Sequence, residues 1–356
     1  MDMQPQERRG VYLQQYKEPA LSREIRQFSN ASAADAFIDL PVGRPLEETA
    51  PEDIIEVARE AKIVDERDGR RLYKKLLRAA FKEIKTVVVD ALDDEPYVSS
   101  QLGPLLALRT EALEGLRAAM RATGAEKNYI VVYKNLSDVD VRVPTVIEGV
   151  PVERVGGKYP AESQIGRELG LHKPYVTLGV CSLIFLSRAL KKGLVQQSTF
   201  VTVAGNCVAN PTNLEVGLGM NLNQVLERCG LADNPTRVII GGPMTGISVI
   251  DTEKTLISPT TRAVLAFKED ERDRHYHCIG CGKCINVCPQ RLDPMLLYRF
   301  LSNRRLSQLP PLHAEKCVNC GTCSYICPSK LPLSTTISRY SETLRKEDED
   351  HETDPA

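Results

Sequence analysis

The chain has 356 residues, of which 42% are hydrophobic and 26% charged, and its formal net charge is −1. This length exceeds the roughly 250–300 residues at which one hydrophobic core stops growing, so we expect two or three domains. The balanced overall charge gives no sign of a nucleic-acid-binding surface.

The first 50 residues are polar with little periodicity, and we expect an N-terminal extension that lies over a neighbour or partner. Met1–Gly10 lacks the apolar core of a signal peptide. The longest apolar stretch, Tyr175–Leu186, is shorter than the roughly 20 residues that span a bilayer. The sequence therefore predicts a cytoplasmic protein without a transmembrane segment, and leaves peripheral membrane association open.

Residues 51–195 predict a Rossmann-like α/β domain. Helices are expected over 52–62, 71–82 and 104–123, the last ending at Gly124. Buried strands are expected over 84–90 and 129–133, where β-branched residues cluster. Strand, helix and strand within about fifty residues indicate a βαβ unit, and hence a parallel sheet.

The pattern changes after a further helix expected over 176–193, in which Cys181 is interpreted as a core residue. Strands are expected over 198–204 and 237–240, with a short helix over 222–228. Strands that flank a short helix indicate a small β-grasp domain, which we place at 196–250.

Two runs in the last third share the cysteine spacing C-x2-C-x2-C-x3-C-P. In bacterial two-cluster ferredoxins the first three thiolates of each run hold one [4Fe-4S] cluster, and the fourth, followed by proline, ligates the other. The sequence therefore predicts two [4Fe-4S] clusters with crossed ligands: Cys278, Cys281 and Cys284 with Cys327, and Cys317, Cys320 and Cys323 with Cys288.

Zinc is the competing interpretation of paired C-x2-C motifs, but a zinc site needs four ligands and leaves C-x3-C-P unexplained in both runs. A disulfide framework is not expected, because the chain is long and cluster ligands must stay reduced until loaded. No residue is assigned a catalytic role.

Each run is followed by a predicted helix, the first capped by Asp293 with Pro294 at its first position. This repeat predicts an α-helical ferredoxin domain over 251–345 and a tail over 346–356. Residues 342–354 hold seven acids, which predict a solvated segment, with an interaction arm as the alternative. His275 and His277 lie just before the first run. We expect them either to be surface residues or to donate hydrogen bonds to a cluster and tune its potential.

Several strings resemble the Rnf-complex C-subunit family, which is related to the flavin-bearing subunit of respiratory complex I. Ile240–Gly246 is similar to its Gly-Gly-Pro-Met segment, Thr202–Pro211 to its β-grasp entry, and the two cysteine runs to its ferredoxin domain. The resemblance implies an α/β domain that binds FMN and NADH and passes electrons to the clusters.

The chain departs from this family where the flavin and nucleotide would bind. The family's glycine-rich loop corresponds here to Ala61–Leu72, which has one glycine and three acids. Asp90–Tyr97 corresponds to the family's segment around the flavin and keeps only its Glu-Pro-Tyr end. Lys158–Glu162 corresponds to the family's later Tyr-Pro segment, but Glu162 is all that it keeps of the glycine and acids there. A diverged flavin site that still works is one interpretation. The acids favour the other interpretation, that FMN and NADH binding has been lost. Their negative charge repels a phosphate, and their side chains take the space that glycines would leave for it.

We therefore expect an electron-transfer iron-sulfur protein that relays electrons between redox partners, one of them a flavoprotein, inside a hetero-oligomeric complex. Whether the chain is itself an enzyme stays open, because the alternative is an NADH-oxidising FMN/iron-sulfur oxidoreductase subunit of the Rnf C type. Cobalamin reduction, a third interpretation, rests on family analogy alone.

Overall fold

The computed structural model describes residues 25–28, 36–134, 143–171, 174–232, 235–268 and 276–341. They divide into two compact units: the first holds the described residues up to Gly156 and from Ile165 to 268, the second Gly157–Gln164 and 276–341. Most of the predicted N-terminal extension, the acidic tail and His275 lie outside the described residues.

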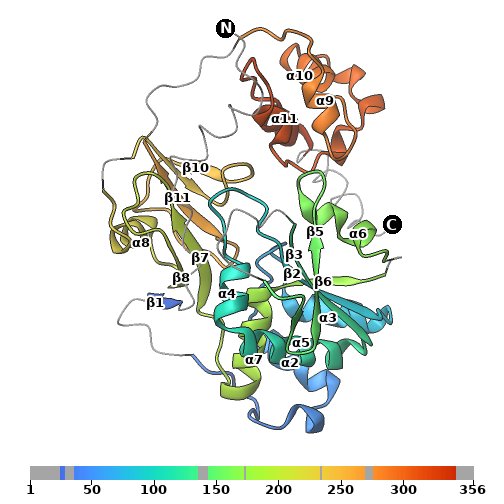
Figure 1. The fold of residues 1–356 in the computed structure, drawn as a ribbon, viewed down its shortest axis with the longest axis vertical. Coiled ribbons are helices and arrows are strands. Elements are labelled where there is room, and N and C mark those ends of the chain that lie inside the picture. The colour runs from blue at the N-terminus through green and yellow to red at the C-terminus, as the bar shows by residue number, and fades with distance from the viewer. Residues whose placement is uncertain are drawn as a thin grey trace, which may run out of the picture. The chain divides into compact units, whose positions relative to one another are not determined.

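A five-stranded sheet with the order β4-β5-β3-β2-β6 forms the centre of the α/β part of the first unit (Figure 1). Neighbouring strands from β5 to β6 run parallel, and β4 is an antiparallel edge strand. The predicted parallel sheet is thus confirmed. The strands are β2 (Thr86–Ala91), β3 (Lys127–Tyr133), β4 (Val146–Ile147), β5 (Val150–Val155) and β6 (Val176–Gly179).

Helices α2 (Pro51–Glu60) and α3 (Leu72–Phe81) follow the predicted ranges closely. The helix predicted over 104–123 is two helices, α4 (Leu102–Ala107) and α5 (Arg109–Thr123). Leu108 leaves the helical conformation between them, with φ −119° and ψ 36°. Gly124 ends α5 in the left-handed conformation, with φ 69°, as its position predicts.

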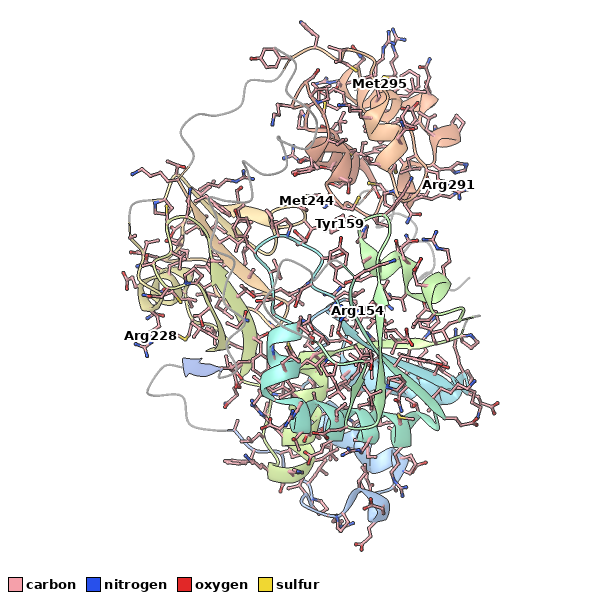
Figure 2. All side chains as sticks on the ribbon, viewed as in Figure 1. Arg154, Tyr159, Arg228, Met244, Arg291 and Met295 are labelled. Carbon is pink, nitrogen blue, oxygen red and sulfur yellow. The ribbon has the colours of Figure 1, made fainter. Side chains whose placement is uncertain are left out.

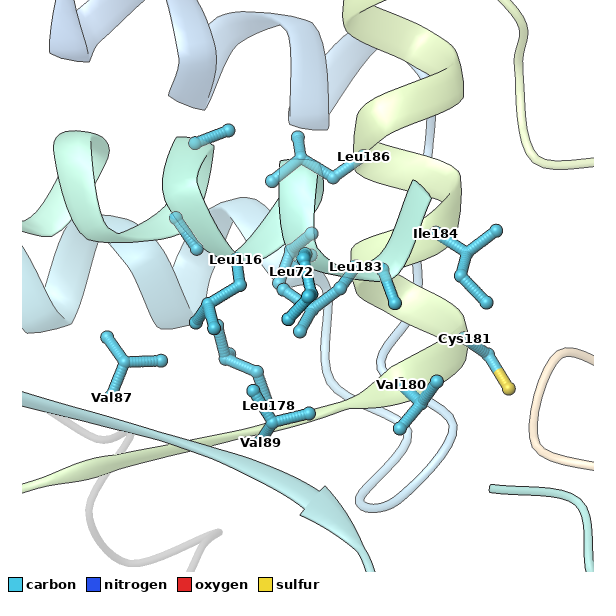
Figure 3. Close-up of a cluster of buried hydrophobic side chains, with 14 of the residues drawn as sticks. Leu72, Val87, Val89, Leu116, Leu178, Val180, Cys181, Leu183, Ile184 and Leu186 are labelled. Atoms are coloured by element: carbon cyan, nitrogen blue, oxygen red, sulfur yellow. The ribbon is translucent and has the colours of Figure 1, made fainter. Parts of the chain in front are cut away.

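The prediction of one helix over 176–193 is wrong at its start. Residues Val176–Gly179 form β6, and α7 covers Val180–Lys192. Pairing of β6 with the buried strand β2 overrides the helical periodicity, because tertiary contacts outweigh local propensity. Leucines of α5, β6 and α7 meet in one core (Figure 3), among them Leu116, Leu178 and Leu183.

A six-stranded sheet with the order β1-β8-β7-β11-β9-β10 forms the rest of the first unit. Its central strand β11 lies beyond residue 250, in the range that we assigned to the ferredoxin domain, and pairs with β7 and β9. The sheet therefore continues further along the chain than predicted. The elements are β1 (Arg26–Phe28), β7 (Ser198–Ala204), β8 (Thr212–Gly217), α8 (Leu222–Arg228), β9 (Arg237–Ile240), β10 (Ile247–Val249) and β11 (Ala263–Phe267).

The second unit repeats a cysteine run followed by a helix. The first run contains α9 (Lys283–Val287) and precedes α10 (Pro294–Ser302), which Asp293 caps through the amide of Leu296. The second run contains α11 (Thr322–Tyr325), and residues 333–341 are helical after it. Short 3-10 helices connect the two halves over 306–316. None of the helices in the described ranges is long and apolar enough to cross a bilayer.

Candidate functional site

The second cysteine run lines a small pocket together with one cysteine of the first run. Cys317, Cys320 and Cys323 face this pocket, and so does Cys288. Burial raises the pKa of the Cys323 thiol to about 12, and the neighbouring charges of Cys320, Cys317 and Cys288 raise it further. Four thiols that repel one another as thiolates form a donor set that fits an iron-sulfur cluster, whose iron compensates their charge.

One cysteine of the second run lies beside the first run. Cys284 is buried and packs with Leu331 and Leu333 in a cluster that Cys327 joins from the second run. Burial raises the pKa of Cys284, and the charge of Cys327 adds to this rise. Cys278 and Cys281 of the same run are exposed. The structure thus brings Cys327 close to the first run and Cys288 close to the second.

Hydrogen-bond donors reach sulfur atoms in both cysteine runs. The Gly280 amide donates to Cys278 Sγ at 3.5 Å, the Leu292 amide to Cys288 Sγ at 3.4 Å, and the Thr322 hydroxyl to Cys320 Sγ at 3.3 Å. Donors to sulfur stabilise the reduced, more negative state of a cluster and so raise its potential.

Hydrogen bonds join the segment before the first run to the residues that follow the second run. The Ser329 hydroxyl donates to the His277 carbonyl at 2.8 Å, and the Tyr276 amide donates to the Ser329 carbonyl at 3.0 Å. Lys158 Nζ donates to the carbonyl of Asn286 at 2.8 Å, which ties Gly157–Gln164 to the first run. Both contacts fix the loops that present cysteines.

A second site of interest is the N-terminus of α7 in the first unit. Its first free amides point at side-chain oxygens: Cys181 and Ser182 each donate to Glu66 at 3.0 Å, and Gly179 donates to Asp65 at 3.2 Å. A helix N-terminus carries partial positive charge and free N–H groups, and therefore binds anions. Here the chain's own carboxylates fill that position.

The arrangement depends on Gly179. A Cβ at this residue would come within 2.1 Å of Glu66 Oε1, so only glycine leaves room for the carboxylate. Burial raises the pKa of Glu66 to about 7, the charge of Asp65 adds to this rise, and the Cys181 amide opposes it. Asp65 is held in turn by Lys75 Nζ at 2.6 Å.

The sequence drew attention to the charge of these acids but did not predict that they are buried. Asp65 and Glu66 are buried, at 0% and 3% exposure, and their carboxylates accept hydrogen bonds inside the first unit. Arg67 between them and Asp68 donates to Asp90 Oδ2 at 3.1 Å. Buried carboxylates in a stretch that reads as a loop have no sequence periodicity that would reveal their partners.

Two acids of Asp90–Tyr97, the segment that corresponds to the family's flavin segment, accept hydrogen bonds from other parts of the first unit. One of these partners is Met244, which is labelled in Figure 2. Glu95 accepts the Met244 amide at 2.8 Å and the Thr245 hydroxyl, which joins this segment to the Gly-Gly-Pro-Met turn. Asp93 accepts the amides of Gln101 and Leu102 at the start of α4. Burial raises the pKa of Asp93 to about 6, and the charge of Arg262 opposes this.

A cavity of about 470 Å³ remains beside these acids. Residues from the 66–69 loop, Glu95, the 240–247 turn and 258–262 line it, with Arg67 and Arg262 as its basic groups. The volume suits a small-molecule ligand, since such pockets measure about 300–1,000 Å³.

Family comparisons match two parts of the chain. Residues 277–331 match the 4Fe-4S dicluster domain and residues 200–248 match the SLBB domain. The first matched range contains all eight cysteines of the two runs.

Curated relatives are the C subunits of ion-translocating complexes. The chain is 29% identical over 231 residues to the C subunit of the Na⁺-translocating ferredoxin:NAD⁺ oxidoreductase complex of Acetobacterium woodii, covering 60% of this chain and 52% of the relative. It is 26% identical over 275 residues to the C subunit of the proton-translocating ferredoxin:NAD⁺ oxidoreductase complex of Clostridium ljungdahlii, covering 72% and 60%. The predicted resemblance is confirmed, and the chain spans a little over half the length of these relatives.

Solved structures agree in fold. A chain of an NAD⁺-reducing [NiFe]-hydrogenase in the H₂-reduced state superposes with a TM-score of 0.57 at 15% identity, covering 85% of this chain and 63% of that chain. The air-oxidized form of such a hydrogenase gives 0.51 at 16% identity, covering 82% and 57%.

Proposed function

We propose that the chain is an electron-transfer subunit that relays electrons through two [4Fe-4S] clusters between redox partners of a larger oxidoreductase complex. One observation carries this proposal: Cys288 of the first run lines the same pocket as Cys317, Cys320 and Cys323. The crossed arrangement is what two adjacent clusters need and what a zinc site does not. The ligands are the eight cysteines of the two runs.

The clusters supply one-electron chemistry, and the residues of the second unit set its conditions. The cysteines hold the clusters, the amides of Gly280 and Leu292 and the hydroxyl of Thr322 stabilise their reduced states, and apolar neighbours such as Leu331 and Leu333 restrict water. With crossed ligands each run would hold part of both clusters, and the clusters would supply the path for the electrons.

We also propose that the chain has lost FMN and NADH. The carboxylates of Asp65 and Glu66 accept hydrogen bonds from the amides at the N-terminus of α7. A ligand phosphate that bound there would have to compete with them for the same donors. The two-electron chemistry then belongs to a flavoprotein partner in the same hetero-oligomeric complex, which we place in the cytoplasm or at the membrane surface.

The second candidate is an NADH-oxidising FMN/iron-sulfur subunit. Two observations favour it: the cavity of about 470 Å³ beside the Gly-Gly-Pro-Met turn, and relatives whose names include NAD⁺.

A cofactor inventory separates the two candidates. Protein purified without oxygen is analysed for iron, acid-labile sulfide and released flavin. The relay predicts about eight iron and eight sulfide per chain without stoichiometric flavin. One flavin per chain supports the second candidate, and zinc in place of iron removes both.

A further inference from the structure

The segment Gly157–Gln164 follows β5 of the α/β part in sequence but belongs to the second unit. Gly157 has φ 102°, a backbone conformation that favours glycine, and a Cβ at Gly156 would lie 3.0 Å from Lys134 Cβ. These two glycines let the chain turn directly after the strand. The segment contains Lys158–Glu162, which the resemblance to the Rnf C subunits singled out and which the proposed function does not use.

Lys158 binds the backbone at the end of α9. Its Nζ donates to the Asn286 carbonyl at 2.8 Å and to the Cys288 carbonyl at 3.4 Å. Helix α9 ends at Val287, so both acceptors lie at its C-terminus, where carbonyls lack partners within the helix and attract cations. The contact involves no cysteine side chain, and it therefore does not depend on how the sulfur atoms are arranged around a cluster.

This contact brings a positive charge close to a cysteine that we assign as a cluster ligand. A cysteine sulfur lies within about 5 Å of its own carbonyl oxygen, which places Lys158 Nζ within roughly 8 Å of Cys288 Sγ. Charges act over this distance, because the Debye length is about 8 Å at physiological ionic strength. None of the ion pairs within the described ranges involves Lys158, so no carboxylate partner there neutralises its charge.

A [4Fe-4S] cluster gains one negative charge when it is reduced, and a nearby positive charge stabilises the reduced state. We propose that Lys158 tunes the electron relay by raising the reduction potential of the second-run cluster, the one assigned to Cys317, Cys320, Cys323 and Cys288. This inference rests on the proposed relay and its ligands. The charge makes this cluster a better acceptor for its one electron, and no atom or proton is transferred.

The competing interpretation is a contact that only holds the segment in place. Lysine, arginine and glutamine side chains all donate hydrogen bonds, but of these only lysine and arginine carry a positive charge. A structural contact needs a donor of suitable reach, whereas a shift in potential needs the charge itself. The substitutions Lys158→Gln and Lys158→Arg therefore separate the two roles, because the first keeps a donor without the charge and the second keeps both.

Redox titration of the full chain tests the proposal, on protein purified without oxygen and with both clusters loaded. Electron paramagnetic resonance follows the two one-electron steps, and the step missing from Cys288→Ala belongs to the second-run cluster. At the potential that half-reduces this cluster in the wild type, Lys158→Gln should lower the ratio of reduced to oxidised cluster about threefold or more. This equals a shift of about 28 mV for one electron. Lys158→Arg should stay near the wild-type ratio, because it keeps the charge.

Three controls establish that the effect is local. Arg304→Gln removes an exposed charge of the same unit outside both cysteine runs, and should shift the second-run potential less than half as far. In Lys158→Gln the potential of the first-run cluster should shift less than that of the second-run cluster. Because Lys158 is exposed, the effect of Lys158→Gln should shrink as ionic strength rises from about 0.01 to 0.5 M.

The proposal is overturned if Lys158→Gln, with both clusters loaded, keeps the wild-type potential, or if Lys158→Arg or Arg304→Gln shifts it equally far. Loss of the second-run cluster from Lys158→Gln, with or without its loss from Lys158→Arg, would also overturn it, since the contact would then serve cluster assembly. Iron and sulfide analysis of the wild type keeps this inference separate from the proposed function: a wild-type chain without two clusters would contradict the relay itself.

Discussion

The carboxylate of Glu66 occupies the space next to Gly179 that any other residue would need for its own side chain: a Cβ at Gly179 would lie 2.1 Å from Glu66 Oε1. Glu66 also accepts the first free amides of α7, from Cys181 and Ser182. A glycine and an acid that are 113 positions apart in the sequence thus form one anion-binding position, filled by the protein itself.

Substitution of Gly179 by alanine should destabilise the first unit by about 1–3 kcal/mol, the usual cost of forcing extra volume into a packed interior. Denaturant unfolding followed by circular dichroism measures this. In a Glu66→Ala background the same substitution should cost clearly less, because the carboxylate that it meets is gone. Equal costs in both backgrounds would contradict the contact between the two residues.

The raised pKa of Glu66 predicts how stability depends on pH. Below pH 4.5 the carboxyl is protonated in both states, and its folded-state pKa of about 7 means that the unfolded chain loses the proton first as pH rises. The contribution of Glu66 to stability is therefore full below pH 4.5 and is lost as pH rises to about 7. The loss is on the order of 3 kcal/mol, from 1.36 kcal/mol per pKa unit.

Glu66→Gln removes this titration. Chemical unfolding of the first unit between pH 5 and 8 should show a shallower pH dependence in the variant than in the wild type. Asp93, whose pKa is raised to about 6, contributes a slope of the same sign that remains in the variant. An unchanged slope in Glu66→Gln would show that Glu66 does not titrate in this range.

Crossed ligation predicts which cluster each fourth cysteine serves. Cys327→Ala should damage the cluster of Cys278, Cys281 and Cys284, because Cys327 lies beside Cys284. Cys288→Ala should damage the cluster of the second run, whose pocket Cys288 lines. Electron paramagnetic resonance of the two reduced variants distinguishes them, and loss of the cluster of the variant's own run would contradict the crossing.

The Thr322 hydroxyl, which donates to Cys320 Sγ, predicts a shift in potential. Thr322→Val should lower the potential of the second-run cluster by on the order of 20–60 mV, since a hydrogen bond contributes about 0.5–1.5 kcal/mol. Thr322→Ser keeps the hydroxyl and serves as the matched control. Redox titration should place the serine variant with the wild type; a valine variant at the wild-type potential would show that this bond does not tune the cluster.

Local patterns predicted much of the fold because local interactions decide it. Pro51 at the start of α2 and Gly124 at the end of α5 act within one helical turn, and the ranges of α8 and β9 were predicted to the residue. Strand β6 and the central strand β11 were missed, because their pairing with β2 and β7 joins segments about 60 or more residues apart.

Of the two candidate sites, the one that depends on local sequence was predicted and the one that depends on a long-range contact was not. Cysteine spacing is a local signal, and it identified eight residues, of which Cys288 lines one pocket with three cysteines of the second run and Cys327 lies beside Cys284. The acids of Ala61–Leu72 were noticed for their charge, but the carboxylate of Glu66 meets α7 across 115 positions of sequence. Such a contact leaves no periodic pattern, so its role emerges only from the folded chain.

The response of the cluster absorbance to NADH tests the central claim most directly. The isolated chain, purified without oxygen and loaded with clusters, is mixed with NADH and then with dithionite while absorbance near 400 nm is followed, roughly where [4Fe-4S] proteins absorb. A relay without FMN predicts that dithionite bleaches the absorbance and NADH does not. Rapid bleaching by NADH alone would contradict the account and establish the chain as an NADH-oxidising flavoprotein.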